Sequence, residues 1–314
     1  MISGASSSRA LRIALLAAAV GVGVLRAAGP HGAVAEPVAV AAACLTGCSA
    51  DACGPLPVSQ LMTLFLASVR DAAEAEMALG AGADIIDLKD PGQGALGALR
   101  LETIATCVRS IAGRVPVSAT VGDLPLEGAT ISDTVGATSA AGIDYVKLGL
   151  FPGTEAASRL NLFAAEASRV RLILVLFADA LPDFDAVKAA AKIGASGVML
   201  DTLGKEAGSL VDHLAVEVAA RFVTAAKAEG LMVGLAGSLK AKHVPELLAL
   251  RPDLLGFRGA LCRGGARNAC LDPVAAASIR ALIPPMPPAP STADSPNSRP
   301  ASVMLGVARY PFAP

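Results

Sequence analysis

A strand-and-helix unit repeats along residues 62–283, and this repeat constrains the fold more than any other feature of the chain. Short apolar runs rich in β-branched residues alternate with Ala-rich stretches of helical character, which is typical of parallel βαβ units. Eight units favour closure into a single (β/α)8 TIM barrel of the α/β class, a fold that commonly uses about 250 residues. The expected strands are Thr63–Ala67, Asp84–Lys89, Pro116–Val121, Tyr145–Gly149, Leu172–Asp179, Gly197–Thr202, Met232–Ser238 and Leu254–Ala260.

The segments between these strands carry the residues that begin and end helices. Gly82, Gly142 and Gly194 each stand two residues before an Asp or Ser that opens a strand. A doubly wound open sheet is the structural alternative, but it usually carries a glycine fingerprint at its first turn, and residues 67–70 have none. Residues suited to helix N-caps are Asp71, Ser132, Thr154, Ser209 and Asp272. Expected helices include Asp71–Leu79, Leu101–Ala112, Asp183–Lys192 and Ser209–Ala228.

The two ends of the chain differ in composition from the middle. Residues 1–61 are rich in Ala, Gly and Ser, and their apolar run 13–25 resembles the middle of a signal peptide but is short for a membrane span. A true start at Met62, with residues 1–61 as a disordered extension or a mis-called start, is the reading we favour over export. Residues 284–314 contain nine prolines and are expected to be disordered.

Charge and composition exclude several classes of partner. The net charge is −1, aromatic residues make up 3% of the chain and Trp is absent, so we expect neither a nucleic-acid nor a membrane partner. Cys44, Cys48 and Cys53 lie close together, but their spacing matches no strong zinc pattern, and no clustered His, Asp and Glu set indicates a metal. We expect a cytoplasmic protein without a cofactor, and a homo-oligomer is left open.

Polar residues stand near the carboxyl ends of the expected strands, where barrels of this class build their active sites. Asp87 and Lys89 are two residues apart and therefore share one strand face, while Ile86 and Leu88 take the other. Tyr145 and Lys147 repeat this arrangement in the fourth strand. Further candidates of this kind are Asp201, Lys205, Asp179, Ser118 and Thr120.

Lysines in such a position indicate a particular chemistry. An ammonium that is partly desolvated and crowded by another ammonium loses its proton more readily, and the neutral amine can form a Schiff base with an aldehyde or ketone. A second lysine or an aspartate can then move protons. We interpret His213 and His243 as surface residues that take no part. The alternative is a set of structural Lys–Asp ion pairs that fill the barrel.

The last two strands end in glycine and small polar residues. Barrels commonly bind phosphate at the loops after strands seven and eight, through backbone N–H groups. Arg258 or Arg263 could add positive charge there. The predicted phosphate-binding residues are Gly237, Ser238, Arg258, Gly259 and Ala260, and the predicted substrate-binding residues are Ser118, Thr120 and Asp179.

Five motifs resemble the (5-formylfuran-3-yl)methyl phosphate synthase family: DIIDLKDPGQGALG at 84–97, PVSATVGD at 116–123, YVKLG at 145–149, LAGSLK at 235–240 and RGALC at 258–262. The resemblance covers residues 62–275. It implies a synthase that condenses two molecules of glyceraldehyde 3-phosphate, with loss of phosphate and water, on the route to methanofuran-type cofactors. By motif, Lys89 matches the Schiff-base lysine and Lys147 the proton acceptor. The matches to supporting positions are Asp87, Asp201 and Lys205.

The chain departs from the family pattern at Arg263 and Ala266, where the resemblance leads us to expect glycine and an acidic residue. Two other functions stay open. A class I aldolase for another phosphosugar would share the lysine chemistry. A non-catalytic, exported barrel that binds ligand would explain the leader but not the lysines. In each case, the partner is a small molecule, phosphorylated in the first two readings.

Overall fold

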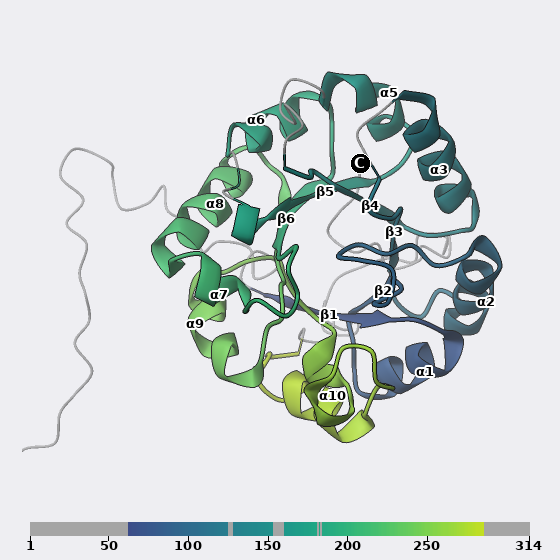
Figure 1. Ribbon diagram of the computed structural model, residues 1–314, viewed down its shortest axis with the longest axis vertical. Coiled ribbons are helices and arrows are strands. Elements are labelled where there is room, and N and C mark those ends of the chain that lie inside the picture. The colour runs from purple at the N-terminus through teal and green to yellow at the C-terminus, as the bar shows by residue number, and fades with distance from the viewer. Residues whose placement is uncertain (1–61, 125–127, 153–159, 181, 183, 286–314) are drawn as a thin grey trace, which may run out of the picture. The chain divides into compact units, whose positions relative to one another are not determined.

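The computed structural model describes residues 62–124, 128–152, 160–180, 182 and 184–285. Within them, eight parallel strands follow one another in chain order, and β8 pairs with β1 to close a barrel inside a ring of helices (Figure 1). The strands are β1 (Leu64–Val69), β2 (Ile85–Leu88), β3 (Val117–Thr120), β4 (Tyr145–Gly149), β5 (Leu172–Phe177), β6 (Gly197–Asp201), β7 (Met232–Leu235) and β8 (Leu254–Phe257). The TIM barrel is confirmed, and the open sheet is excluded.

The helices lie between consecutive strands, as the alternating pattern predicts. The α-helices are α1 (Ala72–Gly80), α2 (Leu101–Ile111), α3 (Gly128–Ala140), α5 (Ala164–Ala167), α6 (Asp185–Lys192), α7 (Leu210–His213), α8 (Val216–Ala228), α9 (Val244–Ala249) and α10 (Pro273–Arg280). The 3-10 turns are η3 (Leu160–Phe163), η4 (Ala178–Ala180), η5 (Ala241–His243), η6 (Gly259–Leu261) and η7 (Arg263–Gly265).

Three of the expected N-caps are confirmed. The carboxylate of Asp71 accepts a hydrogen bond from the backbone N–H of Glu74, and that of Asp272 accepts one from Val274. Ser209 stands at the N-cap of α7, where the Asp212 carboxylate accepts both its backbone N–H and its hydroxyl. The predictions for Thr154, for residues 1–61 and for the tail beyond Pro285 lie outside the described residues, as does the predicted helix start at Asp183.

Three local predictions are wrong. Ser132 lies inside α3, which begins at Gly128, and its hydroxyl donates to Glu166 instead of capping the helix. The single helix expected over Ser209–Ala228 is broken because Leu214 adopts an extended conformation between α7 and α8. The two histidines are not both surface residues: His243 is buried, and His213 is half-buried. The Nδ1 of His243 accepts the backbone N–H of Lys240 at 3.2 Å.

The core has two parts, which the alternation of the strand side chains separates. Ile86 and Leu88 belong to the larger cluster between the strands and the helices. Tyr145 belongs to the smaller cluster inside the barrel. Asp87 and Lys89 are fully or nearly fully buried on the opposite face of β2 from Ile86 and Leu88. The predicted division of β2 into an apolar outer face and a charged inner face is therefore confirmed.

A loop after β2 covers one side of the barrel mouth. Ala95 and Leu96 are buried in the interior cluster, and the carboxylate of Asp123 accepts their N–H groups at 2.9 and 2.7 Å. Phe151 and Phe177 pack nearby, with ring centroids 4.8 Å apart. The carboxyl ends of β3 and β5 consequently contribute no residue to the cavity described below.

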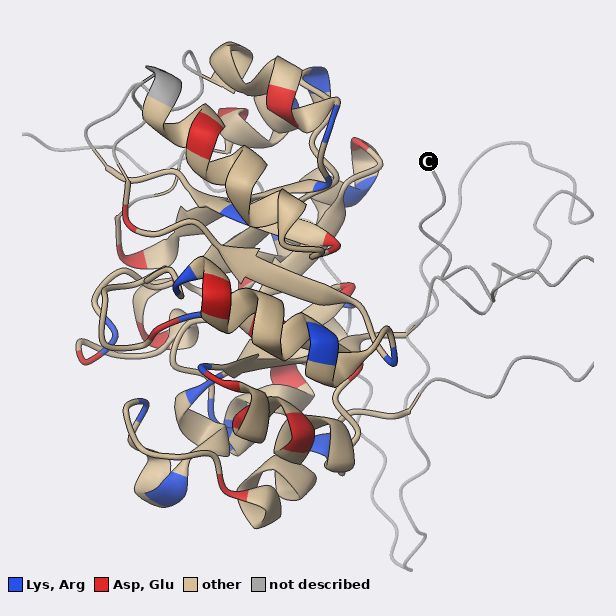
Figure 2. Ribbon diagram, turned by 90° about the vertical axis from the view of Figure 1, so that its right-hand side faces the viewer, with Lys and Arg blue, Asp and Glu red and all other residues tan. Residues whose placement is uncertain are grey.

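The outside of the barrel carries charges of both signs, which are interspersed along the helices (Figure 2). On the side that Figure 2 shows, this distribution agrees with the net charge of −1. In the part of the chain that the structure describes, no helix combines the length and the apolar character needed to span a membrane.

Candidate active site

A cavity of about 550 Å³ opens at the carboxyl ends of β1, β2, β4, β6, β7 and β8. Its floor carries five charged residues that form what we call the lysine cluster: Lys89, Lys147, Lys205, Asp87 and Asp201. All five were predicted as catalytic or supporting residues, and all five line the cavity. Parallel strands bring them together because the side chains that point inward at successive carboxyl ends converge on the barrel axis.

Three ammonium groups share two carboxylates in the lysine cluster. Nζ of Lys147 lies 2.5 Å from Oδ1 of Asp87. Nζ of Lys89 lies 3.6 Å from Oδ2 of Asp201, whose Oδ1 pairs with Lys205. Each side chain is at most 9% exposed. The cluster is therefore buried, and it holds one cation more than it holds anions.

Burial and neighbouring charges shift the protonation of these groups. Burial lowers the pKa of Lys147 and the like charge of Lys89 adds to this effect, while Asp87 opposes it. Burial also lowers the pKa of Lys205 to about 8. Burial alone would raise the pKa of Asp201, but the ammoniums of Lys205 and Lys89 outweigh it and hold that pKa at about 2. Both aspartates thus stay ionised at neutral pH, while two of the lysines give up a proton more easily than usual.

Two serines fix the Asp87 carboxylate from below. Ser68 Oγ donates to Oδ2 and Ser118 Oγ donates to Oδ1, each at 2.7 Å. Ser68 lies in β1 and was not among the predicted site residues. A single serine in an apolar strand forms no sequence pattern that would indicate a functional role. With Lys147 on the same carboxylate, Asp87 is held in one orientation, which in turn fixes the position of the Lys147 amine.

Three residues that the sequence assigned to substrate binding lie behind the cavity wall. Ser118 is bound to Asp87, and Thr120 Oγ1 donates to the carbonyl of Gly97 at 2.9 Å. Asp179 accepts the N–H groups of Leu203 and Gly204 at 2.8 and 2.7 Å. None of the three lines the cavity, because each side chain is bound elsewhere: Ser118 to Asp87, Thr120 to the loop after β2, and Asp179 to the loop after β6. They position the aspartate and two loops, and the structure does not support direct substrate contact.

Backbone N–H groups cluster where β7 and β8 end. Gly237 and Ser238 have positive φ angles of 103° and 47°, and a Cβ on Gly237 would come within 2.9 Å of the backbone nitrogen of Thr202. Among the described residues, no hydrogen-bond acceptor faces the N–H groups of Gly237, Ser238 or Leu239. The N–H groups of Gly259 and Ala260 lie in the first residues of the η6 turn, where a helical turn offers no acceptor to its own N–H groups. We call these five groups the donor site; all five residues line the cavity.

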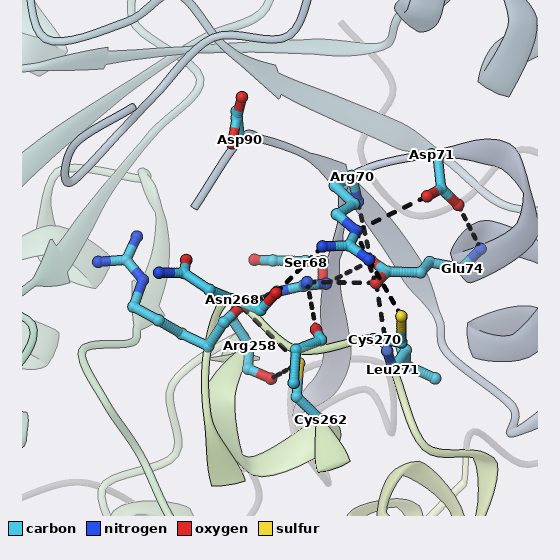
Figure 3. A network of polar contacts seen from close by, with 12 residues as sticks. Ser68, Arg70, Asp71, Glu74, Asp90, Arg258, Cys262, Asn268, Cys270 and Leu271 are labelled. Atoms are coloured by element: carbon cyan, nitrogen blue, oxygen red, sulfur yellow. Dashed lines mark hydrogen bonds and ion pairs between the residues drawn. The ribbon is translucent and has the colours of Figure 1, made fainter. Parts of the chain in front are cut away.

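Arg258 does not offer its guanidinium to the cavity. Its Nη1 and Nη2 lie 2.5 and 3.2 Å from the carboxylate oxygens of Glu74 (Figure 3). Its Nε donates to the carbonyl of Arg267 at 2.9 Å. Nη1 also donates to the carbonyl of Ser68 at 3.1 Å. We call Arg258, Arg70, Glu74, Asp71 and the backbone of residues 267–271 the arginine cluster; its two arginines pair with two carboxylates. The geometry does not favour the predicted phosphate contact by this guanidinium.

Two other cations line the cavity in its place. Lys240 follows the donor site directly in the chain, and Arg267 lies in the loop after η7. The sequence analysis named Arg263 as a candidate, but that residue is exposed and lies outside the cavity lining. The several basic residues after β8 indicate in the sequence that a cation lies near this end of the barrel. Which of their side chains faces the cavity depends on the path of the loop. In the described residues, no group of three or more His, Cys, Asp or Glu side chains could hold a metal ion.

Comparisons with known proteins identify the family of this chain. The family model described as 4-HFC-P synthase matches residues 65–280. A Methylorubrum extorquens protein, provisionally named a (5-formylfuran-3-yl)methyl phosphate synthase, is 42% identical over 215 residues, which cover 68% of this chain and 89% of that protein. The (5-formylfuran-3-yl)methyl phosphate synthase of Methanocaldococcus jannaschii is 35% identical over 218 residues, with 65% and 92% covered.

A solved structure supports the fold. Phosphoribosyl anthranilate isomerase from Thermotoga maritima superposes with a TM-score of 0.53 over 70% of this chain and 98% of its own, at 13% identity. At that identity the likeness concerns the barrel architecture alone. The family model and the relatives carry the assignment further: this chain belongs to the (5-formylfuran-3-yl)methyl phosphate synthase family.

Proposed function

We propose that this enzyme condenses two molecules of glyceraldehyde 3-phosphate into (5-formylfuran-3-yl)methyl phosphate through a Schiff base on Lys89, on the route to methanofuran-type cofactors. The observation that carries the proposal is the lysine cluster itself. Three buried lysines share two aspartates on the floor of a cavity that also holds a donor site. Such a site suits a phosphorylated carbonyl compound.

In the proposed first step, the neutral Lys89 amine attacks the carbonyl carbon of one triose phosphate. A carbinolamine forms, water leaves, and the product is a protonated imine. The contact of Lys89 with Asp201 is the longest ion pair of the cluster, at 3.6 Å, and is therefore the least restraining. The carboxylate of Asp201 stays charged and can stabilise the iminium ion.

Lys147 is suited to move protons between the carbon atoms. Burial lowers the pKa of its amine, and Asp87 with its two serine donors holds the amine in one place. Removal of a proton from the carbon next to the iminium lets the phosphate at C3 leave, which gives an enol on the three-carbon iminium. The terminal carbon of this enol then attacks the C2 carbonyl of the second triose phosphate, which has isomerised to its ketose form. Lys205, with a pKa of about 8, can supply or accept a second proton.

The donor site is suited to hold the phosphate of the imine-bound molecule. Backbone N–H groups at the ends of β7 and β8 can contact several phosphate oxygens at once. After the carbon–carbon bond has formed, a hydroxyl group of the second triose closes the ring on the C2 carbonyl of the first, two molecules of water leave, and hydrolysis of the imine releases Lys89. Together with the eliminated phosphate, these losses balance the conversion of two trioses into the furan product. The sum of these steps changes no oxidation state, so the proposed reaction requires no redox cofactor.

Borohydride trapping tests this proposal. The purified enzyme is incubated with glyceraldehyde 3-phosphate, reduced with borohydride, digested and analysed by mass spectrometry. We expect a secondary amine at Lys89, and we expect the Lys89→Met variant to lose it together with all product. A control with the exposed Lys188→Met variant should behave like wild type. A reduced adduct at another lysine, or no adduct, would contradict the assignment of Lys89.

Product analysis separates this function from that of a class I aldolase. Both enzymes would give an imine, so trapping alone cannot distinguish them. Only the furan synthase yields an aromatic aldehyde from triose phosphate as sole substrate, together with free phosphate. Absorbance of the furan aldehyde, with a phosphate assay on the same sample, gives the answer. An aldol product without phosphate release would favour the aldolase.

A further inference from the structure

Arg267 differs from most other cations of the cavity in having no ion-pair partner. Lys89, Lys147 and Lys205 pair with the two aspartates, and Arg258 pairs with Glu74. Among the described residues, no carboxylate lies within 4.0 Å of the Arg267 guanidinium, although Glu206 and Asp212 also line the cavity. The same holds for Lys240, which continues the donor site. A half-buried guanidinium in such surroundings is suited to an anion brought in by the substrate.

Both ends of Arg267 are held in place. Its carbonyl accepts the Nε of the buried Arg258 at 2.9 Å, which ties its backbone to the arginine cluster. At the other end, Nη2 donates to the carbonyl of Gly94 at 3.0 Å. The side chain therefore extends from the loop after β8 to the loop after β2, and its remaining N–H groups make no other hydrogen bond with a described residue.

The Gly94 end is a fixed anchor. Gly94 has a φ of 108°, and a Cβ there would lie 2.0 Å from the Asp123 carboxylate. That carboxylate also holds the next two N–H groups of the loop. Because Gly94 follows Lys89 by five residues in the same loop, the guanidinium lies on the β2 side of the cavity. The donor site lies on the β7 and β8 side.

We propose that Arg267 binds the phosphate of the second triose phosphate, and that the donor site with Lys240 binds the phosphate of the first. This inference rests on the proposed function, since only a reaction between two phosphorylated molecules needs two anion sites in one cavity. Each phosphate dianion needs its own donors, because two dianions in one subsite would repel each other strongly. The proposed arrangement places one anion site on each side of the lysine cluster.

The test compares Arg267→Gln with wild type and with Arg221→Gln, which removes an exposed arginine on α8. We expect Arg267→Gln to lower kcat/KM for furan formation roughly 10- to 100-fold, as for the loss of a charge-assisted hydrogen bond. Borohydride trapping of the first triose on Lys89 should stay at the wild-type level. Arg267→Lys should recover part of the activity, because it keeps the charge. Arg221→Gln should change none of these values.

Titration with inorganic phosphate in a calorimeter gives a reading that does not depend on turnover. We expect two phosphate ions per chain for wild type and one for Arg267→Gln. Wild-type furan formation in Arg267→Gln, or an unchanged number of phosphate ions, would overturn the inference, as would a parallel loss of Lys89 trapping. If Arg267→Gln does not fold, the calorimetric titration of Arg267→Lys replaces it as the test. Weaker phosphate binding at one of the two sites supports the inference, and unchanged binding at both sites overturns it. Failure of the proposed function itself would show as no Lys89 adduct in wild type.

Discussion

The lysine cluster at the ends of β2, β4 and β6 is buried, and so is the Arg258–Glu74 pair at the centre of the arginine cluster, which joins β8 to α1. The two clusters nevertheless balance their charges differently. In the arginine cluster, Glu74 accepts hydrogen bonds from Arg258 and from the N–H groups of Arg70 and Leu271 (Figure 3). Every nitrogen of the Arg258 guanidinium has a fixed acceptor. In the lysine cluster, three ammoniums compete for two carboxylates.

The difference shows that burial of charge does not by itself mark a reactive site. A guanidinium keeps its proton in proteins, so the arginine cluster can only hold structure in place. Burial lowers the pKa of a lysine amine, and a third ammonium beside only two carboxylates lowers it further. The cluster with too few carboxylates is therefore the one suited to chemistry, and the balanced cluster holds the loop that carries η6 and η7.

After the loss of Lys89, the largest effect should follow from removal of the Lys147 amine. Lys147→Met removes the proposed proton acceptor, and we expect kcat to fall by about 10²- to 10⁴-fold. It also leaves Asp87 buried without its cation, which costs about 3–5 kcal/mol of folding free energy. The double variant Lys147→Met/Asp87→Asn should recover most of that stability, measured by urea unfolding, without recovering activity. Recovery of both would mean that the pair is only structural.

The next effect concerns the arginine cluster. Glu74→Gln leaves Arg258 buried without its anion, so we expect a loss of about 3–5 kcal/mol in unfolding free energy. The folded fraction should keep its kcat, and KM should rise because the η6 donors shift. Thermal and urea unfolding together with steady-state kinetics test this. A loss of kcat comparable to that of Lys147→Met would remove the distinction between the two clusters.

A smaller effect should appear in acid. The pKa of Asp201 is about 2 in the folded protein, against an ordinary value of 3.8. Because the folded pKa is the lower one, its contribution to stability is complete above about pH 4 and is lost as the pH falls towards 2. The shift corresponds to about 2 kcal/mol. Relative to Asp201→Asn, wild type should lose this amount of unfolding free energy between pH 4 and pH 2. Parallel curves would contradict the assigned pKa.

Much of the fold and of the lysine cluster could be predicted because both depend on short-range patterns. Alternation with a period of two assigns Asp87 and Lys89 to one face and Ile86 and Leu88 to the other. The order of strands in a βαβ repeat then brings their carboxyl ends to one rim. Errors at this level are small: β7 ends at Leu235, where the pattern suggested Ser238, because the positive φ angles of residues 237 and 238 turn the chain.

What the sequence by itself determined is therefore the closed barrel and the lysines and aspartates on its floor. Only the tertiary structure decided which side chains reach the cavity. Arg258 finds its carboxylate on Glu74, 184 residues away in the chain. The side chains of Ser118, Thr120 and Asp179 bind Asp87 and neighbouring loops and do not line the cavity. Arg267 extends across the cavity because the loop after β2 offers it the carbonyl of Gly94. Strand patterns are local, but the contacts of long loops depend on residues that meet only after the barrel has closed.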